Sequence, residues 1–156
     1  MQKTCCFTGH RPEKSLFCEQ TEALLFYEAI KNAVSDGYNV FITGMAMGAD
    51  IIAAEQVLKL KKIYPDIKLI CASPFEGCHK RWSSDWRKRY ENILSNADEK
   101  EFISPHYSAF CFHKRNYWMV DRANRVIASF NGSTGGTKNT IEYAKRKQKE
   151  IVILEK

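Results

Sequence analysis

The chain has 156 residues, of which 44% are hydrophobic and 27% are charged, and its formal net charge at pH 7 is +6. This size suits one folded domain spanning residues 1–156, and the short apolar stretches exclude a membrane span. We expect a cytoplasmic protein, because the first residues lack the extended apolar region of a secretory signal. The positive charge favours nucleotides, nucleic acid or acidic partners without choosing among them.

In chain order the apolar spacing predicts a strand over residues 4–8, a helix over 16–35, a strand over 39–43, a helix over 50–62 and a strand over 67–72. It then predicts a helix over 81–97, a weaker strand over 101–104, a helix over 114–123, a strand over 125–130, a helix over 139–149 and a strand over 151–154. Such alternation is typical of an α/β, Rossmann-like, doubly wound fold with a mainly parallel sheet and helices on both faces.

The six cysteines show no metal-binding pattern. No CxxC pair occurs, and neither Cys78-His79 nor Cys111 with His113 has partners at recognisable spacing, so we expect no metal site. Reduced thiols fit a cytoplasmic address. Three of the cysteines lie in apolar runs and are expected to be small core residues, namely Cys5, Cys6 and Cys71.

The sequence RVIASFNGSTGGTKNTIEYA, residues 125–144, indicates a strand, a glycine-rich loop and the start of a helix. Backbone amides at a helix N-terminus bind anions, and glycines at 135 and 136 would let a phosphate approach the backbone. Thr137 or Asn139 is expected to cap the helix. An ordinary strand-to-helix turn is the alternative interpretation.

Two further loops follow predicted strands, at residues 8–12 and 43–50, and in a parallel sheet they should converge with the first. Neither contains GxGxxG, which disfavours ordinary NAD-dependent dehydrogenase chemistry. His10 and Arg11 are suited to hold a phosphate, or form a solvated surface turn. Asp50 is suited to accept hydrogen bonds from a ribose, or simply favours a helix N-terminus.

Four segments together carry a family resemblance: CCFTGHRPEK, TGMAMGADIIAAE, SPFEGCHKRW and KRNYWMVDRANRVIASFNGSTGGTKNTIEYAKRK. They resemble the YpsA-like family of the SLOG superfamily, which also includes DprA and the lonely-guy (LOG) proteins, over nearly the whole chain. The resemblance implies a bacterial, Rossmann-like protein that binds a nucleotide or nucleotide-derived ligand, with a link to cell division or stress and no settled biochemical activity.

LOG enzymes release a base from a nucleoside monophosphate, and the resemblance makes Arg115 the candidate catalytic arginine of this chain. The glutamate of the LOG motif would fall at position 140, where this chain has threonine. Glu142 lies about 200° further round the helix and is not expected to replace it. We therefore favour a sensor or regulator over an enzyme, with a phosphoribohydrolase as the alternative.

The third loop also resembles that of DprA, which binds single-stranded DNA. A basic segment with Trp82 and Trp86 would offer stacking and phosphate attraction, although core packing is the commoner use of such tryptophans. DNA binding is therefore a second alternative, below small-ligand binding. The sequence leaves the oligomeric state open, including a homo-oligomer.

The candidate ligand-binding residues lie in these loops and their immediate neighbours. They are Thr8, Gly9, His10, Arg11, Gly44, Met45, Gly48, Ala49, Asp50, Pro74, Arg115, Gly135, Gly136, Thr137, Asn139 and Thr140. No cofactor is predicted beyond a nucleotide-derived ligand.

Overall fold

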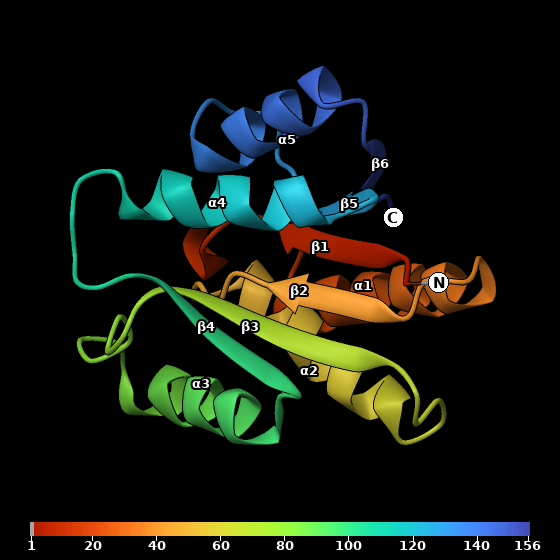
Figure 1. Ribbon diagram of the computed structural model, residues 1–156, viewed down its shortest axis with the longest axis horizontal. Helices are drawn as coiled ribbons and strands as arrows, with labels where there is room; N and C mark the ends of the chain where they lie inside the picture. Colours follow the sequence, from red (N-terminus) through yellow and green to blue (C-terminus); the bar gives the residue numbers. More distant parts are fainter. Residues whose placement is uncertain (1) are drawn as a thin grey trace.

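A six-stranded sheet forms the centre of the computed structural model, which describes residues 2–156 (Figure 1). All five strand pairings are parallel, and the strand order is β4-β3-β2-β1-β5-β6. The strands are β1 (Thr4–Thr8), β2 (Val40–Thr43), β3 (Lys68–Phe75), β4 (Glu99–Ser104), β5 (Arg125–Ala128) and β6 (Glu150–Ile153). The predicted Rossmann-like α/β fold is confirmed.

Helices cover both faces of the sheet. They are α1 (Glu19–Ser35), α2 (Ala49–Lys61), α3 (Ser84–Asn96), α4 (Cys111–Arg122) and α5 (Gly136–Arg146), with a short 3₁₀ turn, η1, at Pro12–Lys14. The first three pack together on one face, and α4 and α5 pack together on the other. Within residues 2–156 none of the helices combines the length and apolar character that a membrane span requires.

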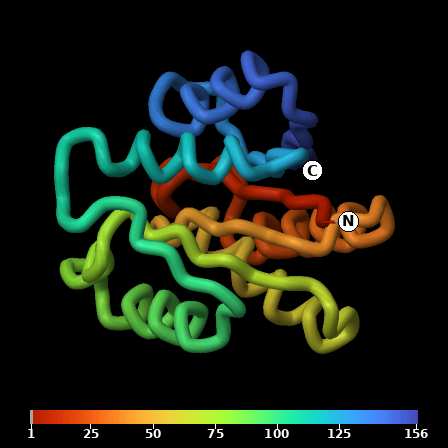
Figure 2. The backbone as a smooth tube through the Cα atoms, viewed as in Figure 1, coloured from red at the N-terminus to blue at the C-terminus, as the bar shows by residue number. Residues whose placement is uncertain are grey.

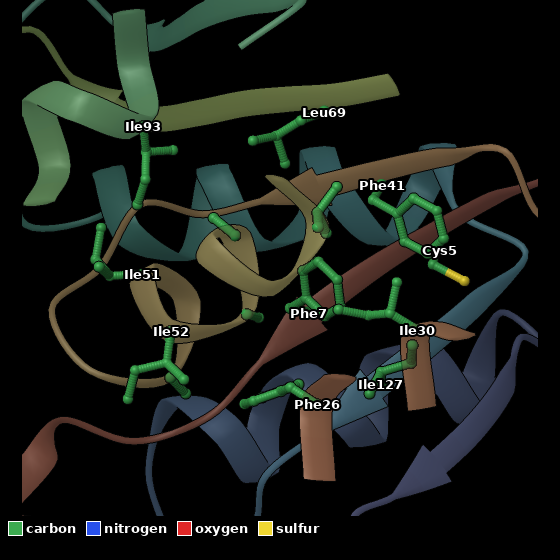
Figure 3. Packing of buried hydrophobic residues seen from close by; sticks show 14 of the residues in the cluster. Cys5, Phe7, Phe26, Ile30, Phe41, Ile51, Ile52, Leu69, Ile93 and Ile127 are labelled. Carbon is green, nitrogen blue, oxygen red and sulfur yellow. The ribbon is translucent and has the colours of Figure 1, made fainter. Parts of the chain in front are cut away.

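The larger of two apolar clusters lies between the sheet and helices α1 to α3 (Figure 3). Phe7 of β1 is fully buried there, with its ring centroid 6.2 Å from that of Phe41 and 5.7 Å from that of Phe26. Burying one such side chain contributes about 1.5–3 kcal/mol. The expected core positions of Cys5, Cys6 and Cys71 are confirmed, and all six cysteines are free.

Several predicted helix starts are wrong by three residues. The first helix begins at Glu19 instead of residue 16, because Pro12 opens a separate 3₁₀ turn and the chain is extended at Ser15. The third begins at Ser84, after a series of turns, and the fourth begins early, at Cys111. The last begins at Gly136 rather than Asn139, because Gly135 adopts a φ of +138° and serves as the N-cap.

The carboxyl ends of the strands all lie at one edge of the sheet, because every pairing is parallel. In Figure 2 the long connection between β4 and α4 runs along this edge, at the left of the view, while both chain ends are marked at the right. The loops in which the sequence analysis placed its candidate residues therefore begin on the same side of the molecule.

Candidate functional site

The sheet reverses its winding direction between β1 and β5. From β1 the chain continues through α1 to β2 on one side, and from β5 it continues through α5 to β6 on the other. Because α1 and α5 cover opposite faces, the loops after β1 and β5 diverge. Ligands of open α/β sheets bind in the crevice at such a reversal.

Gly9, at the end of β1, lies between the N-termini of two helices. A Cβ atom added to Gly9 would clash with the Cβ of Ala49, the first residue of α2. The carbonyl oxygen of Gly9 accepts a 2.8 Å hydrogen bond from the hydroxyl of Thr137, in the first turn of α5. The positive ends of two helix dipoles therefore meet at one residue.

The N-terminus of α5 is open. Its N-cap is Gly135, which has no side chain to bond the helix amides, and Cβ atoms added to Gly135 or Gly136 would meet nothing within 4 Å. Among residues 2–156 no acceptor pairs with the backbone amides of Gly136, Thr137 and Lys138. These three donors are available to an anion.

The threonines of α5 stabilise the loop rather than cap the helix, which corrects the prediction that Thr137 or Asn139 would be the N-cap. The Thr137 hydroxyl is used on Gly9, and the Thr140 hydroxyl donates to the Gly136 carbonyl at 2.8 Å. Asn139 is exposed, whereas Thr140 is buried. At this helix end the backbone amides are free to bind an anion, whereas both threonine hydroxyls already form hydrogen bonds.

His10 joins the loop after β1 to the loop after β5. Its Nε2 accepts a 3.0 Å hydrogen bond from the backbone N–H of Asn131, and its Nδ1 lies 3.5 Å from the Thr137 hydroxyl. Burial lowers the pKa of His10, so the ring is neutral near pH 7 with its proton on Nδ1. The neighbouring Arg11 is exposed and supplies the positive charge of this loop.

Asp50 and Arg115 are buried on either side of Gly44. The Asp50 carboxylate accepts a 3.3 Å hydrogen bond from the Ala46 amide, and Arg115 donates through Nη1 to the Gly44 carbonyl at 2.5 Å. A Cβ at Gly44 would lie 2.7 Å from Asp50 Oδ2 and 3.0 Å from Arg115 Cδ. This loop therefore requires glycine.

Burial dominates the ionisation of this pair. It raises the pKa of Asp50 to about 6, even though the positive charge of Arg115 acts in the opposite direction. Burial likewise lowers the pKa of Arg115, which the Asp50 carboxylate partly offsets. Asp50 can therefore exchange a proton near neutral pH, as a general acid or base would.

Glu22 is a buried carboxyl group that the sequence analysis missed. Its Oε2 accepts hydrogen bonds from the hydroxyls of Ser129, directly after β5, and Ser15. Burial raises its pKa, against these two hydrogen bonds. Glu22 shares the buried face of α1 with Phe26 and Ile30 at four-residue spacing, and a carboxylate in that apolar stripe was the available signal.

The other predicted residues contribute differently. Met45, Ala49 and Pro74 are buried, and Met45 has a φ of +59°, so they shape the loops. Gly48 has a φ of +99° and packs against the His10 carbonyl. Thr8 is buried at the end of β1, and its carbonyl accepts from the Ser129 amide.

Helix α3 and the turn before it carry the two tryptophans. Arg89 forms ion pairs with Glu55 at 2.6 Å and Glu19 at 3.2 Å, and its guanidinium lies 4.1 Å from the Trp86 ring centroid. Trp82 packs edge-on against the buried Tyr90. A groove of about 720 Å³ lined by residues of α1, α2 and α3 contains the Arg89 ion pairs.

No cluster of three or more metal-ligating side chains occurs within residues 2–156. The functional groups at the strand ends are two helix N-termini, a neutral histidine, a buried arginine and two buried carboxyls. Such a set is suited to holding an anion and to moving a proton through hydrogen bonds.

Solved structures share this fold. DprA of Streptococcus pneumoniae superimposes with a TM-score of 0.70 at 16% identity, over 97% of this chain and 50% of that one. DprA of Helicobacter pylori gives a TM-score of 0.68 at 24% identity, over 99% of this chain and 66% of that one. A molybdenum cofactor binding protein of Rippkaea orientalis gives 0.63 at 18% identity, over 98% and 76%. The chain thus spans half to two thirds of the DprA chains.

Sequence comparison identifies nearer relatives. The SPbeta prophage-derived protein YoqJ of Bacillus subtilis is 38% identical over 118 residues, covering 68% of this chain and 69% of YoqJ. The UPF0398 protein YpsA of the same organism is 24% identical over 156 residues, covering 95% and 87%. The model of YpsA, described as the YspA SLOG family, matches residues 5–154, and the chain therefore belongs to that family.

Proposed function

We propose that this chain binds a nucleotide or nucleotide-derived anion at the carboxyl ends of β1 and β5, as a single-domain cytosolic sensor or regulator. The open N-terminus of α5 is the observation that carries the proposal. Within residues 2–156 its first three amides have no acceptor, and Gly135 and Gly136 leave the space in front of them free. A phosphate there would accept from those amides at the positive end of the helix dipole.

The surroundings of α5 support the same ligand chemistry. The N-terminus of α2 meets α5 across Gly9, and the exposed Arg11 adds a cation on the connecting loop. By their names, two proteins of this fold bind single-stranded DNA and the molybdenum cofactor. Ligand binding is therefore a use that this fold supports.

Binding without turnover fits the composition of the site. Thr140 occupies the position of the LOG glutamate, and its hydroxyl is held by the Gly136 carbonyl. Glu142 is exposed and lies 4.0 Å from Lys138, one turn back on the same helix. No carboxylate of α5 is thus available to stabilise the positive charge that develops when a glycosidic bond breaks.

Hydrolysis of a nucleoside monophosphate is the second candidate, because Asp50 has a pKa of about 6 and lies beside the buried Arg115. Incubation with AMP followed by chromatography distinguishes the two. A sensor leaves AMP intact. Adenine released over many turnovers, and lost in the Arg115→Ala variant, would establish the hydrolase instead.

DNA binding through α3 and the basic turn before it is less well supported. Arg89, the best-placed cation of that helix, is already paired with two carboxylates. Lys80, Arg81 and Arg87 are exposed, but Trp82 and Trp86 are partly buried against the core. Stacking on these rings would require them to leave their present contacts.

Gly136→Leu tests the proposed function. Position 136 does not need a positive φ, and a Cβ there meets nothing within 4 Å, so the fold should be retained while the side chain blocks the amides. We expect the affinity for AMP, measured by isothermal titration calorimetry, to fall at least about tenfold.

Ser84→Leu is the matched control, because Ser84 is also the exposed first residue of a helix, α3. It should leave AMP binding unchanged. Mass spectrometry of small molecules that co-purify with both variants then identifies the ligand lost with Gly136→Leu. Undiminished AMP binding by Gly136→Leu would contradict the assignment.

A further inference from the structure

Three aromatic rings from separate parts of the chain form an exposed cluster. The ring centroids of Phe75 and Tyr107 lie 5.9 Å apart, those of Tyr107 and Phe112 lie 6.3 Å apart, and those of Phe75 and Phe112 lie 6.5 Å apart. Tyr107 is 63% exposed and Phe112 is 40% exposed. Clustered aromatic surface in contact with solvent marks interaction sites more often than isolated exposed residues do.

The cluster lies at the same edge of the sheet as the candidate site. Phe75 is the last residue of β3, Tyr107 belongs to the connection that follows β4, and Phe112 lies in the first turn of α4. In Figures 1 and 2 this connection runs beside the carboxyl ends of the strands. The rings therefore continue the line of loops that begins at β5 and β1.

Arg115 connects the rings to the anion site. It follows Phe112 by three residues on α4, and its guanidinium carbon lies 5.9 Å from the centroid of that ring. The same guanidinium donates to the carbonyl of Gly44, at the end of β2. The order across the edge is thus α5 amides, Gly9, the Gly44 loop, Arg115 and then the rings.

The spacing of the strands sets how long a ligand must be to reach both the α5 amides and the aromatic rings. Two inter-strand intervals separate β1 from β3, about 10 Å across the sheet, and Phe75 lies three residues, about another 10 Å, beyond the level of Thr8. The two strand ends are therefore about 14 Å apart. That distance is comparable with the length of an extended nucleoside phosphate. A phosphate at Gly9 and α5 would leave the far end of such a ligand near Phe75 and Phe112.

We propose that Phe75, Tyr107 and Phe112 form the subsite for the nucleobase, so that the ligand is a nucleotide with a planar aromatic base stacked on exposed rings. This inference rests on the proposed function, because it assumes a phosphate at α5. Every base has a π-face, so the subsite recognises a base as such and tolerates differences among the four. The tryptophans of α3 and of the turn before it are unsuited to this role, because Trp82 packs on Tyr90 and Trp86 is covered by Arg89.

The test compares phosphates with and without a base. The full chain is titrated with ribose 5-phosphate and with AMP, GMP, CMP and UMP, and each nucleotide should bind more tightly than the sugar phosphate. Phe112→Ala should weaken nucleotide binding about 5-fold to 150-fold and leave ribose 5-phosphate binding unchanged. Phe112→Trp should restore it.

Phe110→Ala is the matched control. Phe110 is 56% exposed and only two residues away, but its ring packs against His113 and Tyr117 instead of the cluster. It should leave every affinity unchanged. Circular dichroism and urea unfolding of each variant show that the fold is retained.

The two proposals fail in different ways. Equal affinity of the unsubstituted chain for nucleotides and for ribose 5-phosphate would overturn the base subsite alone. The same holds if Phe112→Ala weakens the binding of nucleotides and of ribose 5-phosphate by the same factor. Undiminished binding in Gly136→Leu, or no binding of any of these phosphates, would overturn the phosphate site and the base subsite together. A short oligothymidylate bound more tightly than every nucleotide, and lost in Phe112→Ala, would assign the rings to single-stranded DNA and refute the small ligand.

Discussion

Asp50→Asn should stabilise the protein in a manner that depends on pH. The carboxyl group of Asp50 is buried, and its pKa rises from an ordinary 3.8 to about 6 on folding. Between these values the folded chain binds more protons than the unfolded chain, so the free energy of unfolding falls as the pH rises. Each pKa unit corresponds to about 1.4 kcal/mol, so the loss from this group is about 3 kcal/mol by neutral pH.

Urea unfolding at constant ionic strength from pH 4 to pH 8 measures this contribution. Asparagine keeps the size of the side chain and an oxygen that accepts from the Ala46 amide, but it carries no charge. The free energy of unfolding of Asp50→Asn minus that of the unsubstituted chain should grow by about 2.4 kcal/mol between pH 4 and pH 7, because a small part of the effect is already present at pH 4. Asp66→Asn controls for the same chemical change at an exposed turn. A difference that stays constant across the range would refute the reasoning.

Two further predictions concern the junction at the end of β1. Gly9→Ala places a Cβ against Ala49 and Ser129 and should lower the free energy of unfolding by about 1–3 kcal/mol. A lower midpoint of urea unfolding would report this loss. An unchanged midpoint would mean that the neighbouring helices move apart without cost. Thr137→Val keeps the branched shape but loses the hydroxyl that donates to Gly9, and should cost about 1 kcal/mol in the same assay. If Thr137→Val unfolds at the same urea concentration as the unsubstituted chain, that hydrogen bond contributes nothing.

The sequence was most informative where local pattern and tertiary structure agree. The central strands are continuous apolar runs because helices cover both faces, and all six strands were found close to their true positions. The helix starts were less predictable. The N-cap of α5 is Gly135, which caps through its backbone conformation and offers no polar side chain as a signal, so the sequence pattern favours Thr137 or Asn139 instead.

The site itself was predictable as a set of loops but not as a set of contacts. Arg115 was identified from its motif, yet its hydrogen bond to the Gly44 carbonyl spans 71 positions of the chain. Glu22 went unnoticed because its partner Ser129 lies 107 positions away. The aromatic cluster joins residues of β3, the β4–α4 connection and α4, and no local pattern reports such a meeting.

Gly9 has a mechanical consequence for the whole molecule. Its backbone touches α2 on one face of the sheet, and its carbonyl oxygen holds α5 on the other. Neither helix can shift along its axis without displacing the end of β1, and through it the opposite helix. The two layers of helices on opposite faces of the sheet are therefore coupled at a residue that has no side chain.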